Sequence, residues 1–125
     1  MMGRAIGIDL GATRTIAAVW DEAPRVLLNR ESQDFTPSAV GTYKKQICVG
    51  QLALDRMLLA PRDTILSVRR LMGQGLHAPA VEEVRRRHMY AIVEPSDGTD
   101  DDLRVVMDGK QYSPIEISAM ILKKA

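Results

Sequence analysis

Near its start the chain reads Gly7-Ile8-Asp9-Leu10-Gly11-Ala12-Thr13-Arg14, a short apolar run followed by small and polar residues. A second apolar run, residues 15–20, comes directly after it, so the pair predicts a β-hairpin whose loop carries Gly11. Such a loop can direct successive backbone N–H groups at phosphate oxygens, and Asp9 can hold the hydrated magnesium ion that accompanies them. In the alternative interpretation, Asp9 only caps the hairpin and Gly11 only turns it. The residues of this stretch leave both interpretations open.

The rest of the chain alternates between strand-like and helix-like patterns. We expect a third strand over 25–29, a second hairpin from 38–43 and 46–49, and later strands over 88–93 and 103–107 with turns at 95–98 and 108–109. Apolar spacing predicts one helix that starts at Gly50 and ends before Pro61, and a second that Asp63 or Thr64 caps and Gly73 ends. A third helix is expected over 80–87. These patterns predict a mixed α/β fold.

Interactions between residues close in sequence also favour the third helix and a last helix near the end of the chain. The pairs Glu82 with Arg86 and Glu83 with Arg87 have the favourable spacing of four on the third helix. In the last segment, Ser113 as N-cap, Pro114 at the first helical position and Glu116 form a capping box. No glycine or turn residue closes the helix that follows, so we expect a truncated helix and hence a truncated protein.

Composition limits the class of protein. A chain of 125 residues, 46% hydrophobic and 26% charged, suits one modest globular domain. The net charge of +1 provides no broad positive field, so neither nucleic acid nor an anionic membrane is an expected partner. Cys48 cannot form an internal disulfide and is predicted to be a buried structural thiol. The chain shows no signal peptide and no run long enough to span a membrane, so we expect a cytoplasmic location.

Several other candidate motifs are better explained by structure alone. His77, His88 and Cys48 lack the spacing of metal ligands, and Gly73-Gln74-Gly75 is a helix stop and not a dinucleotide loop. The carboxylates at 97 and 100–102 lack the spacing of a calcium loop. Arg85-Arg86-Arg87 is interpreted as a charged helix end, with a partner-docking patch as the alternative.

The opening stretch resembles the first phosphate loop of the actin and heat-shock chaperone superfamily. The chaperones characteristically have Asp-Leu-Gly-Thr-Thr, which Asp9-Leu10-Gly11-Ala12-Thr13 matches at four of five positions. Further matches follow in the chaperones' order and spacing: Thr36-Pro37-Ser38, Val49-Gly50-Gln51, Ser67-Val68-Arg69-Arg70-Leu71-Met72-Gly73 and Ile117-Ser118-Ala119-Met120-Ile121-Leu122-Lys123-Lys124. The chain therefore resembles, nearly from end to end, the DnaK-type heat shock protein 70 chaperones. Sugar kinases of the superfamily share only the first loop.

The resemblance implies an actin-like ATPase fold with a ribonuclease-H-like motif, present here as an incomplete first lobe. Residues 1–37 would form the base subdomain, with the opening β-meander and the first phosphate loop. Residues 38–112 would form an outer α+β subdomain, and residues 113–125 would begin a helix of the base subdomain.

The resemblance also implies a function, the binding and hydrolysis of ATP to control the binding of unfolded peptides. ATP and Mg²⁺ would be the cofactors, and the partners of the whole protein would be unfolded polypeptide clients, a J-domain protein and a nucleotide exchange factor. The resemblance places six residues at the positions of the family's site. They are Gly11, Ala12, Thr13 and Arg14 for the nucleotide, Asp9 for magnesium through water, and Arg69 at the catalytic lysine's position.

Three of these positions depart from the family's pattern. Ala12 keeps the backbone N–H but lacks the hydroxyl of the family's threonine, and Arg69 replaces a compact ammonium by a planar fork. Arg14 stands where the family usually has asparagine or tyrosine. Two alternatives therefore stay open: a fragment of a sugar kinase of the same superfamily, and a chaperone relative that binds nucleotide without hydrolysing it. The 125-residue piece itself is expected to be inactive and prone to self-association.

Overall fold

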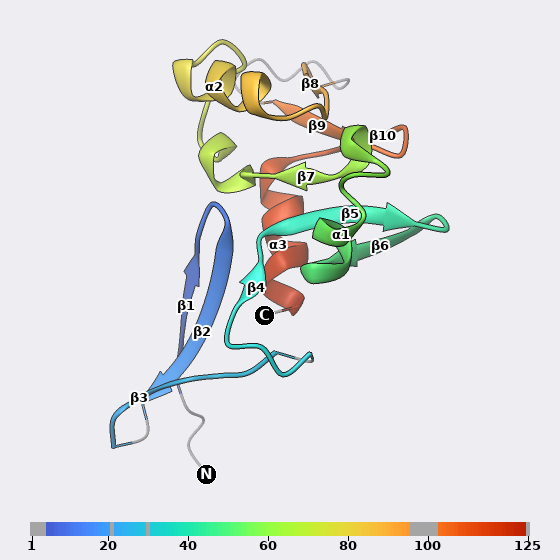
Figure 1. The fold of residues 1–125 in the computed structure, drawn as a ribbon. Coiled ribbons are helices and arrows are strands. Elements are labelled where there is room, and N and C mark those ends of the chain that lie inside the picture. The colour runs from blue at the N-terminus through green and yellow to red at the C-terminus, as the bar shows by residue number, and fades with distance from the viewer. Residues whose placement is uncertain (1–4, 21, 30, 96–102, 125) are drawn as a thin grey trace.

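The structure is a computed structural model that describes residues 5–20, 22–29, 31–95 and 103–124 (Figure 1). Within these ranges three antiparallel sheets combine with short helices, which confirms the mixed α/β class. The elements, in chain order, are β1 (Ile6–Leu10), β2 (Arg14–Trp20), β3 (Pro24–Val26), β4 (Thr36–Pro37), β5 (Ala39–Tyr43), β6 (Gln46–Val49), α1 (Gln51–Asp55), the 3-10 helix η1 (Pro61–Asp63), β7 (Ile65–Leu66), the 3-10 helix η2 (Val68–Leu71), α2 (Pro79–Arg87), β8 (Ile92–Val93), β9 (Arg104–Met107), β10 (Lys110–Tyr112) and α3 (Pro114–Lys124).

The first sheet is built on the β1–β2 hairpin, as predicted. The two strands pair from Ile6 opposite Val19 to Leu10 opposite Thr15. On its other edge β2 pairs with β3 and, nearer the hairpin tip, with β4. Figure 1 shows the hairpin at one side of the molecule, with its tip beside the segment that carries β7 and η2. The sheet therefore brings the loop after β1 close to the outer part of the chain.

The second and third sheets form that outer part. The predicted hairpin of β5 and β6 is confirmed, and its turn residues Lys44 and Lys45 both have positive φ, as a two-residue turn of type I′ requires. β7 pairs with the other edge of β5. The third sheet has the order β10-β9-β8, and the predicted turn at Asp108-Gly109 joins β9 to β10.

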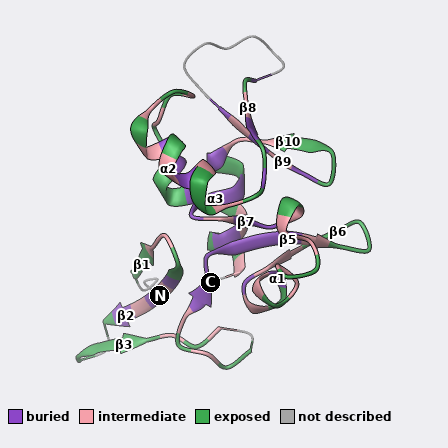
Figure 2. Ribbon diagram, turned by 45° about the horizontal axis from the view of Figure 1, so that its top comes forward, coloured by how far each residue is buried: buried purple, intermediate pink, exposed green. Residues whose placement is uncertain are grey.

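One hydrophobic core joins α2, α3, η2 and the two outer sheets. Its fully buried side chains include Leu71 of η2, Val84 of α2, Val105 of β9 and Ile117 of α3. Figure 2 shows burial along β4 and β5, whereas β3 and the turn between β5 and β6 are exposed. Because these core side chains are closely packed, a change such as Leu71→Ala is expected to cost about 2–5 kcal/mol.

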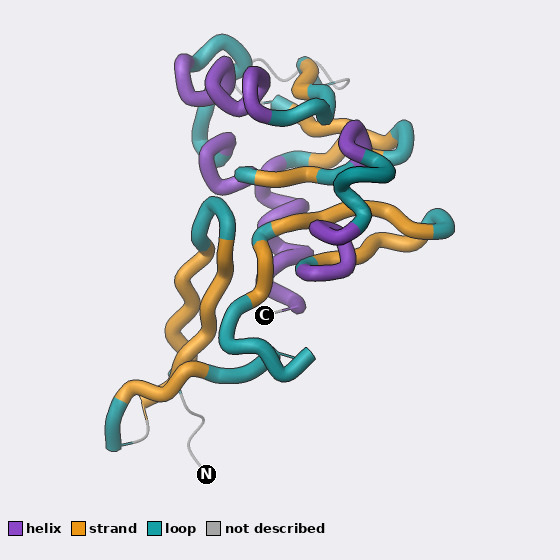
Figure 3. Tube along the Cα trace, viewed as in Figure 1, coloured by secondary structure: helices purple, strands orange, loops and turns teal. Residues whose placement is uncertain are grey.

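Of the two helices predicted between β6 and α2, one is shorter than expected and the other does not form (Figure 3). The first, expected from Gly50 to Pro61, is helical only over Gln51–Asp55, and turns and η1 follow it. The second does not form, because its start is the strand β7 and its middle is the short 3-10 helix η2. Ser67, in the left-handed conformation with φ 59°, separates the two elements. The edge of β5 offers hydrogen bonds to Ile65, and this tertiary pairing outweighs the helical spacing.

Two strands are shorter than the sequence predicted. The third strand covers only Pro24–Val26, and the strand expected over 88–93 only Ile92–Val93, where pairing with β9 begins. The expected turn at 95–98 falls partly outside the described residues. None of the helices in the described ranges is long and apolar enough to cross a membrane.

The helix α2 confirms its prediction, with one change in its ion pairs. Arg87 pairs with Glu83 at 2.8 Å, as expected. Glu82, however, pairs with Arg85 at 2.7 Å and not with Arg86. The Arg85 guanidinium also donates to the Ile92 carbonyl oxygen at 3.1 Å, which holds it on the side of Glu82. Arg86 reaches Glu83 at 3.7 Å.

The capping box of α3 is confirmed in both directions. The Glu116 N–H donates to Ser113 Oγ at 3.1 Å, and the Ser113 N–H donates to Glu116 Oε1 at 3.0 Å. Ile117 and Ile121 of this helix are fully buried. At its other end, Lys124 pairs with Glu31 at 2.7 Å, which ties the helix to the loop before β4.

Candidate functional site

The loop after β1 is closed by one backbone hydrogen bond. The Gly11 N–H donates to the Arg14 carbonyl oxygen at 3.0 Å. A Cβ atom at Gly11 would lie 2.4 Å from that same oxygen, a separation that real Cβ atoms do not reach. Only glycine is therefore compatible with the turn, and the loop's shape depends on it.

Ser38 holds the loop against the start of the outer sheet. Its N–H donates to the Thr13 carbonyl oxygen at 2.9 Å, and its hydroxyl lies 2.9 Å from the Thr15 hydroxyl. Thr15 and Ser38 are only 1% and 2% exposed, so neither hydroxyl can turn to water instead. Breaking such a buried pair costs about 1–3 kcal/mol. The backbone of the loop is therefore fixed at Gly11 and again at Thr13.

The loop forms one wall of a cavity of about 330 Å³. The other walls come from the segment through β4, from α1 and from the residues around β7. The lining consists of Ala12, Thr13, Arg14, Phe35, Pro37, Ser38, Ala39, Gln51, Leu54, Leu66, Ser67 and His88. A largely apolar cavity with a few convergent polar groups is the usual form of a small-molecule site.

Arg14 lies at this cavity with its guanidinium over an aromatic ring. The Arg14 Cζ is 4.5 Å from the centroid of the Phe35 ring, within the range of a cation–π contact. Arg14 is otherwise exposed. The contact keeps a positive charge beside the loop, where anionic groups would be attracted.

Ser67 and His88 also line the cavity and form a polar pair. The Ser67 hydroxyl lies 3.1 Å from His88 Nε2, and the His88 ring stacks on Tyr90 with centroids 5.7 Å apart. Burial, with the nearby Arg70 and Arg87 charges, lowers the pKa of His88 below its usual value. His88 is therefore neutral at pH 7. The sequence predicts only an ordinary residue at His88, because its partner Ser67 lies 21 positions earlier in the chain and leaves no local signal.

Asp9 and Arg69 do not line the cavity. Asp9 lies on β1 opposite Ile16 and is exposed. Arg69 lies on η2, two residues after Ser67, and is also exposed, with no ion-pair partner among the described residues. Their predicted roles stay predictions.

The described side chains near the loop do not form a site that would coordinate a metal ion directly. In the described ranges, no three His, Cys, Asp or Glu side chains gather closely enough to hold a metal ion. A single exposed carboxylate, as at Asp9, fits a contact through water better than direct coordination, since Mg²⁺ keeps much of its hydration shell.

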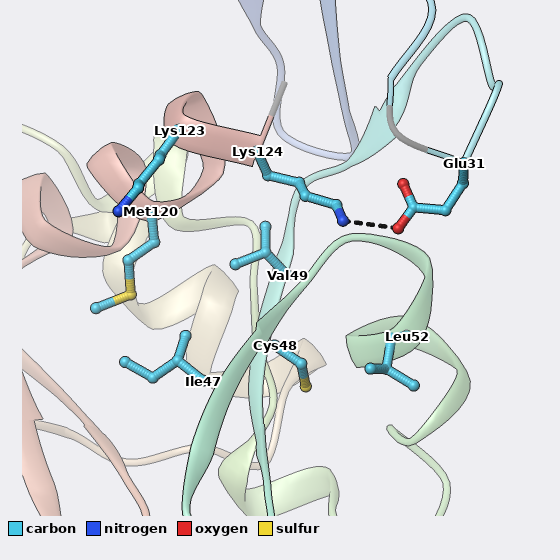
Figure 4. Close-up of a pocket in the computed structure, with 8 residues that line it drawn as sticks. All are labelled: Glu31, Ile47, Cys48, Val49, Leu52, Met120, Lys123 and Lys124. Atoms are coloured by element: carbon cyan, nitrogen blue, oxygen red, sulfur yellow. Dashed lines mark ion pairs between the residues drawn. The ribbon is translucent and has the colours of Figure 1, made fainter.

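A larger cavity of about 510 Å³ lies away from the loop, between β6, α1 and the end of α3 (Figure 4). Ile47, Val49, Leu52 and Met120 supply apolar walls, and the Lys124–Glu31 ion pair crosses its rim. Cys48 is half-buried there, and burial raises the pKa of its thiol despite the opposing charge of Arg56. The thiol is therefore protonated at neutral pH, but Cys48 is less buried than the sequence predicted, because it lines this cavity.

Comparison with known proteins identifies the family. The family model described as Hsp70 protein matches residues 5–125. The chaperone protein DnaK of Thermus thermophilus is 40% identical over 124 residues, which cover 98% of this chain and 19% of the relative. The mitochondrial-type heat shock protein 70 of Encephalitozoon cuniculi is 36% identical over 120 residues, covering 95% of this chain and 20% of the relative. The chain spans about a fifth of the length of these curated relatives. It belongs to the heat shock protein 70 family.

Proposed function

We propose that this chain is the N-terminal part of a DnaK-like chaperone and carries the first phosphate loop of an actin-like ATPase domain. Membership of the family supports a nucleotide as the ligand of this loop. The observation that carries the proposal is the glycine-closed loop on the wall of a cavity of about 330 Å³. A loop fixed at Gly11 and Thr13 keeps its backbone N–H groups in place before a phosphate arrives, which reduces the entropic cost of binding.

We also propose that the chain divides into two subdomains, with a boundary just after the segment that pairs with the loop's hairpin. Residues 1–37 and 113–125 belong to the base subdomain and residues 38–112 to the outer one. The boundary at Ser38 is supported by the pairing of β4 with β2, whereas β5, which begins at Ala39, pairs with β6 and β7. The Ser38 hydrogen bonds would then link the phosphate loop to the outer subdomain.

Each candidate residue has a proposed task. The backbone of Gly11, Ala12 and Thr13 would hold phosphate oxygens, and the Arg14 guanidinium would add positive charge. Asp9 would orient magnesium through water. Arg69 would stabilise the charge that develops as the terminal phosphate is transferred, because positioning and electrostatics dominate phosphoryl transfer. Bound MgATP supplies the phosphoryl group.

For the whole protein, we propose that ATP hydrolysis controls the binding of unfolded polypeptide clients, with a J-domain protein and a nucleotide exchange factor as partners, in the cytoplasm. Family membership supports the general chaperone role. A relative that binds nucleotide without hydrolysing it is the second candidate, and Ala12 and Arg69 favour it. A sugar kinase gains no support from the family assignment.

The proposal is tested with a full-length protein that contains this segment. Gly11→Ala should abolish saturable MgATP binding in titration calorimetry, because the added Cβ would meet the Arg14 carbonyl oxygen at 2.4 Å. Gly75→Ala is the matched control, since a Cβ atom there meets nothing within 4 Å. If Gly11→Ala binds MgATP as tightly as the parent while its circular dichroism is unchanged, the loop is not the phosphate site.

A further inference from the structure

A groove on the outer part of the chain is lined mostly by apolar side chains. It is a cavity of about 320 Å³ between the turns that follow α1, the β7 segment and the end of α2. Its lining consists of Met57, Leu58, Pro61, Thr64, Leu66, Arg87, His88 and Met89. We call it the outer groove.

The apolar residues at this groove are unusually exposed. Leu58 is 87% exposed, its neighbour Leu59 78%, and Met89 58%. The helix α1 ends at Asp55, and the turn that follows, closed by Leu59 N–H to Arg56 carbonyl at 3.0 Å, leaves both leucines at the surface. Water around three large apolar side chains beside a groove is unfavourable, and such surfaces commonly mark protein interaction sites.

The end of α2 adds positive charge at the groove. Arg86 and Arg87 share one carboxylate, Glu83, at 3.7 and 2.8 Å. Arg85 has its own partner in Glu82. The last turn of α2 therefore carries one more positive charge than these carboxylates neutralise. Arg87 and His88 both line the groove, so the guanidinium of Arg87 lies at its wall.

We propose that the outer groove binds a segment of a partner protein in which leucine-like side chains lie next to carboxylates. The groove would take the apolar side chains, and the end of α2 would pair with the carboxylates. This combination of an apolar centre with an arginine at its edge is typical of protein interfaces. Nucleic acid fits less well, because the net charge of the chain is only +1 and the groove wall is apolar.

The test uses the 125-residue chain and a short fluorescein-labelled peptide of Leu-Glu-Glu-Leu repeats. Fluorescence anisotropy should show saturable binding, and the methyl signals of Leu58 and Met89 should shift in NMR spectra. Leu58→Ser and Met89→Ser should each weaken binding about tenfold, because both remove apolar contacts from the centre of the interface. Ile115→Ser is the matched control, since Ile115 is 69% exposed but lies outside the groove.

Charge is tested separately. Arg87→Gln should weaken binding severalfold and reduce its dependence on salt, because surface charge interactions are screened by ions. Lys110→Gln removes an exposed charge on β10 that does not line the groove, and it should weaken binding far less than Arg87→Gln. A peptide with lysine in place of every glutamate should not bind.

Four results would overturn the proposal. They are equal binding of the lysine peptide, unchanged binding by Leu58→Ser and Met89→Ser, displacement of the acidic peptide by a short oligonucleotide, and self-association of the chain that Leu58→Ser abolishes. The last would make a second copy of this chain the occupant.

Discussion

Single residues set the shape of the candidate nucleotide site. Gly11 permits a turn in which its own N–H reaches the Arg14 carbonyl oxygen, and the Ser38 N–H fixes the carbonyl oxygen of Thr13, the residue before Arg14. The sequence predicted the loop, because a glycine between two short apolar runs is a local signal, although β1 itself is largely exposed and not buried. It did not predict the Ser38–Thr15 or Ser67–His88 contacts, since those partners are 23 and 21 positions apart. Contacts of that kind depend on how the sheets meet.

Arg69 gives a prediction at this scale. In a full-length protein that contains this segment, Arg69→Lys should raise the rate of ATP hydrolysis by about tenfold or more, because a compact ammonium suits a lysine site better than a planar fork. Single-turnover hydrolysis measures the effect. Arg62→Lys, an exposed arginine outside the cavity, is the control and should leave the rate unchanged. A lysine variant no faster than the parent would show that guanidinium geometry does not limit the reaction.

At the scale of elements, the sequence predicted correctly those elements whose interacting residues are close together in the chain. The β1–β2 and β5–β6 hairpins, α2 and the capping box of α3 all formed as predicted. The helix expected from 64 to 72 failed because Ile65 pairs with Val40 of β5, a strand that lies far earlier in the chain. Periodicity cannot reveal that an open sheet edge will compete for the same residues.

The capping box of α3 gives the second prediction. Ser113→Ala removes the acceptor for the Glu116 N–H and should lower the free energy of unfolding by about 1 kcal/mol. Urea unfolding, followed by circular dichroism, measures the change. Lys123→Ala, an exposed position of the same helix, should cost less. If Ser113→Ala is as stable as the parent, water replaces the cap without loss.

At the scale of the whole molecule, the first sheet differs from the two outer sheets. The outer sheets share a continuous core with α2 and α3, whereas β1 is largely exposed and Ile6 and Ile8 on it are 57% and 48% accessible. Trp20 at the end of β2 is also exposed. A sheet with this much apolar surface in water is a site for association with other protein surfaces. Self-association of the isolated chain is expected for this reason.

The last prediction concerns the 125-residue chain on its own. We expect it to bind MgATP no better than about millimolar, near −4 kcal/mol, and not to hydrolyse it. The loop Gly11–Arg14 offers phosphate contacts, yet Asp9 and Arg69 lie outside the cavity wall and are exposed to water, where charge interactions are weak. The cavity is also lined by a single aromatic ring besides His88, and that ring, Phe35, already carries the Arg14 guanidinium. An adenine ring therefore finds little to stack against. Titration calorimetry with MgATP measures the affinity, with Gly11→Ala as the control for the loop. Saturable binding at low micromolar concentration that Gly11→Ala removes would show that this chain alone holds the nucleotide and that the expected dependence on further contacts is wrong.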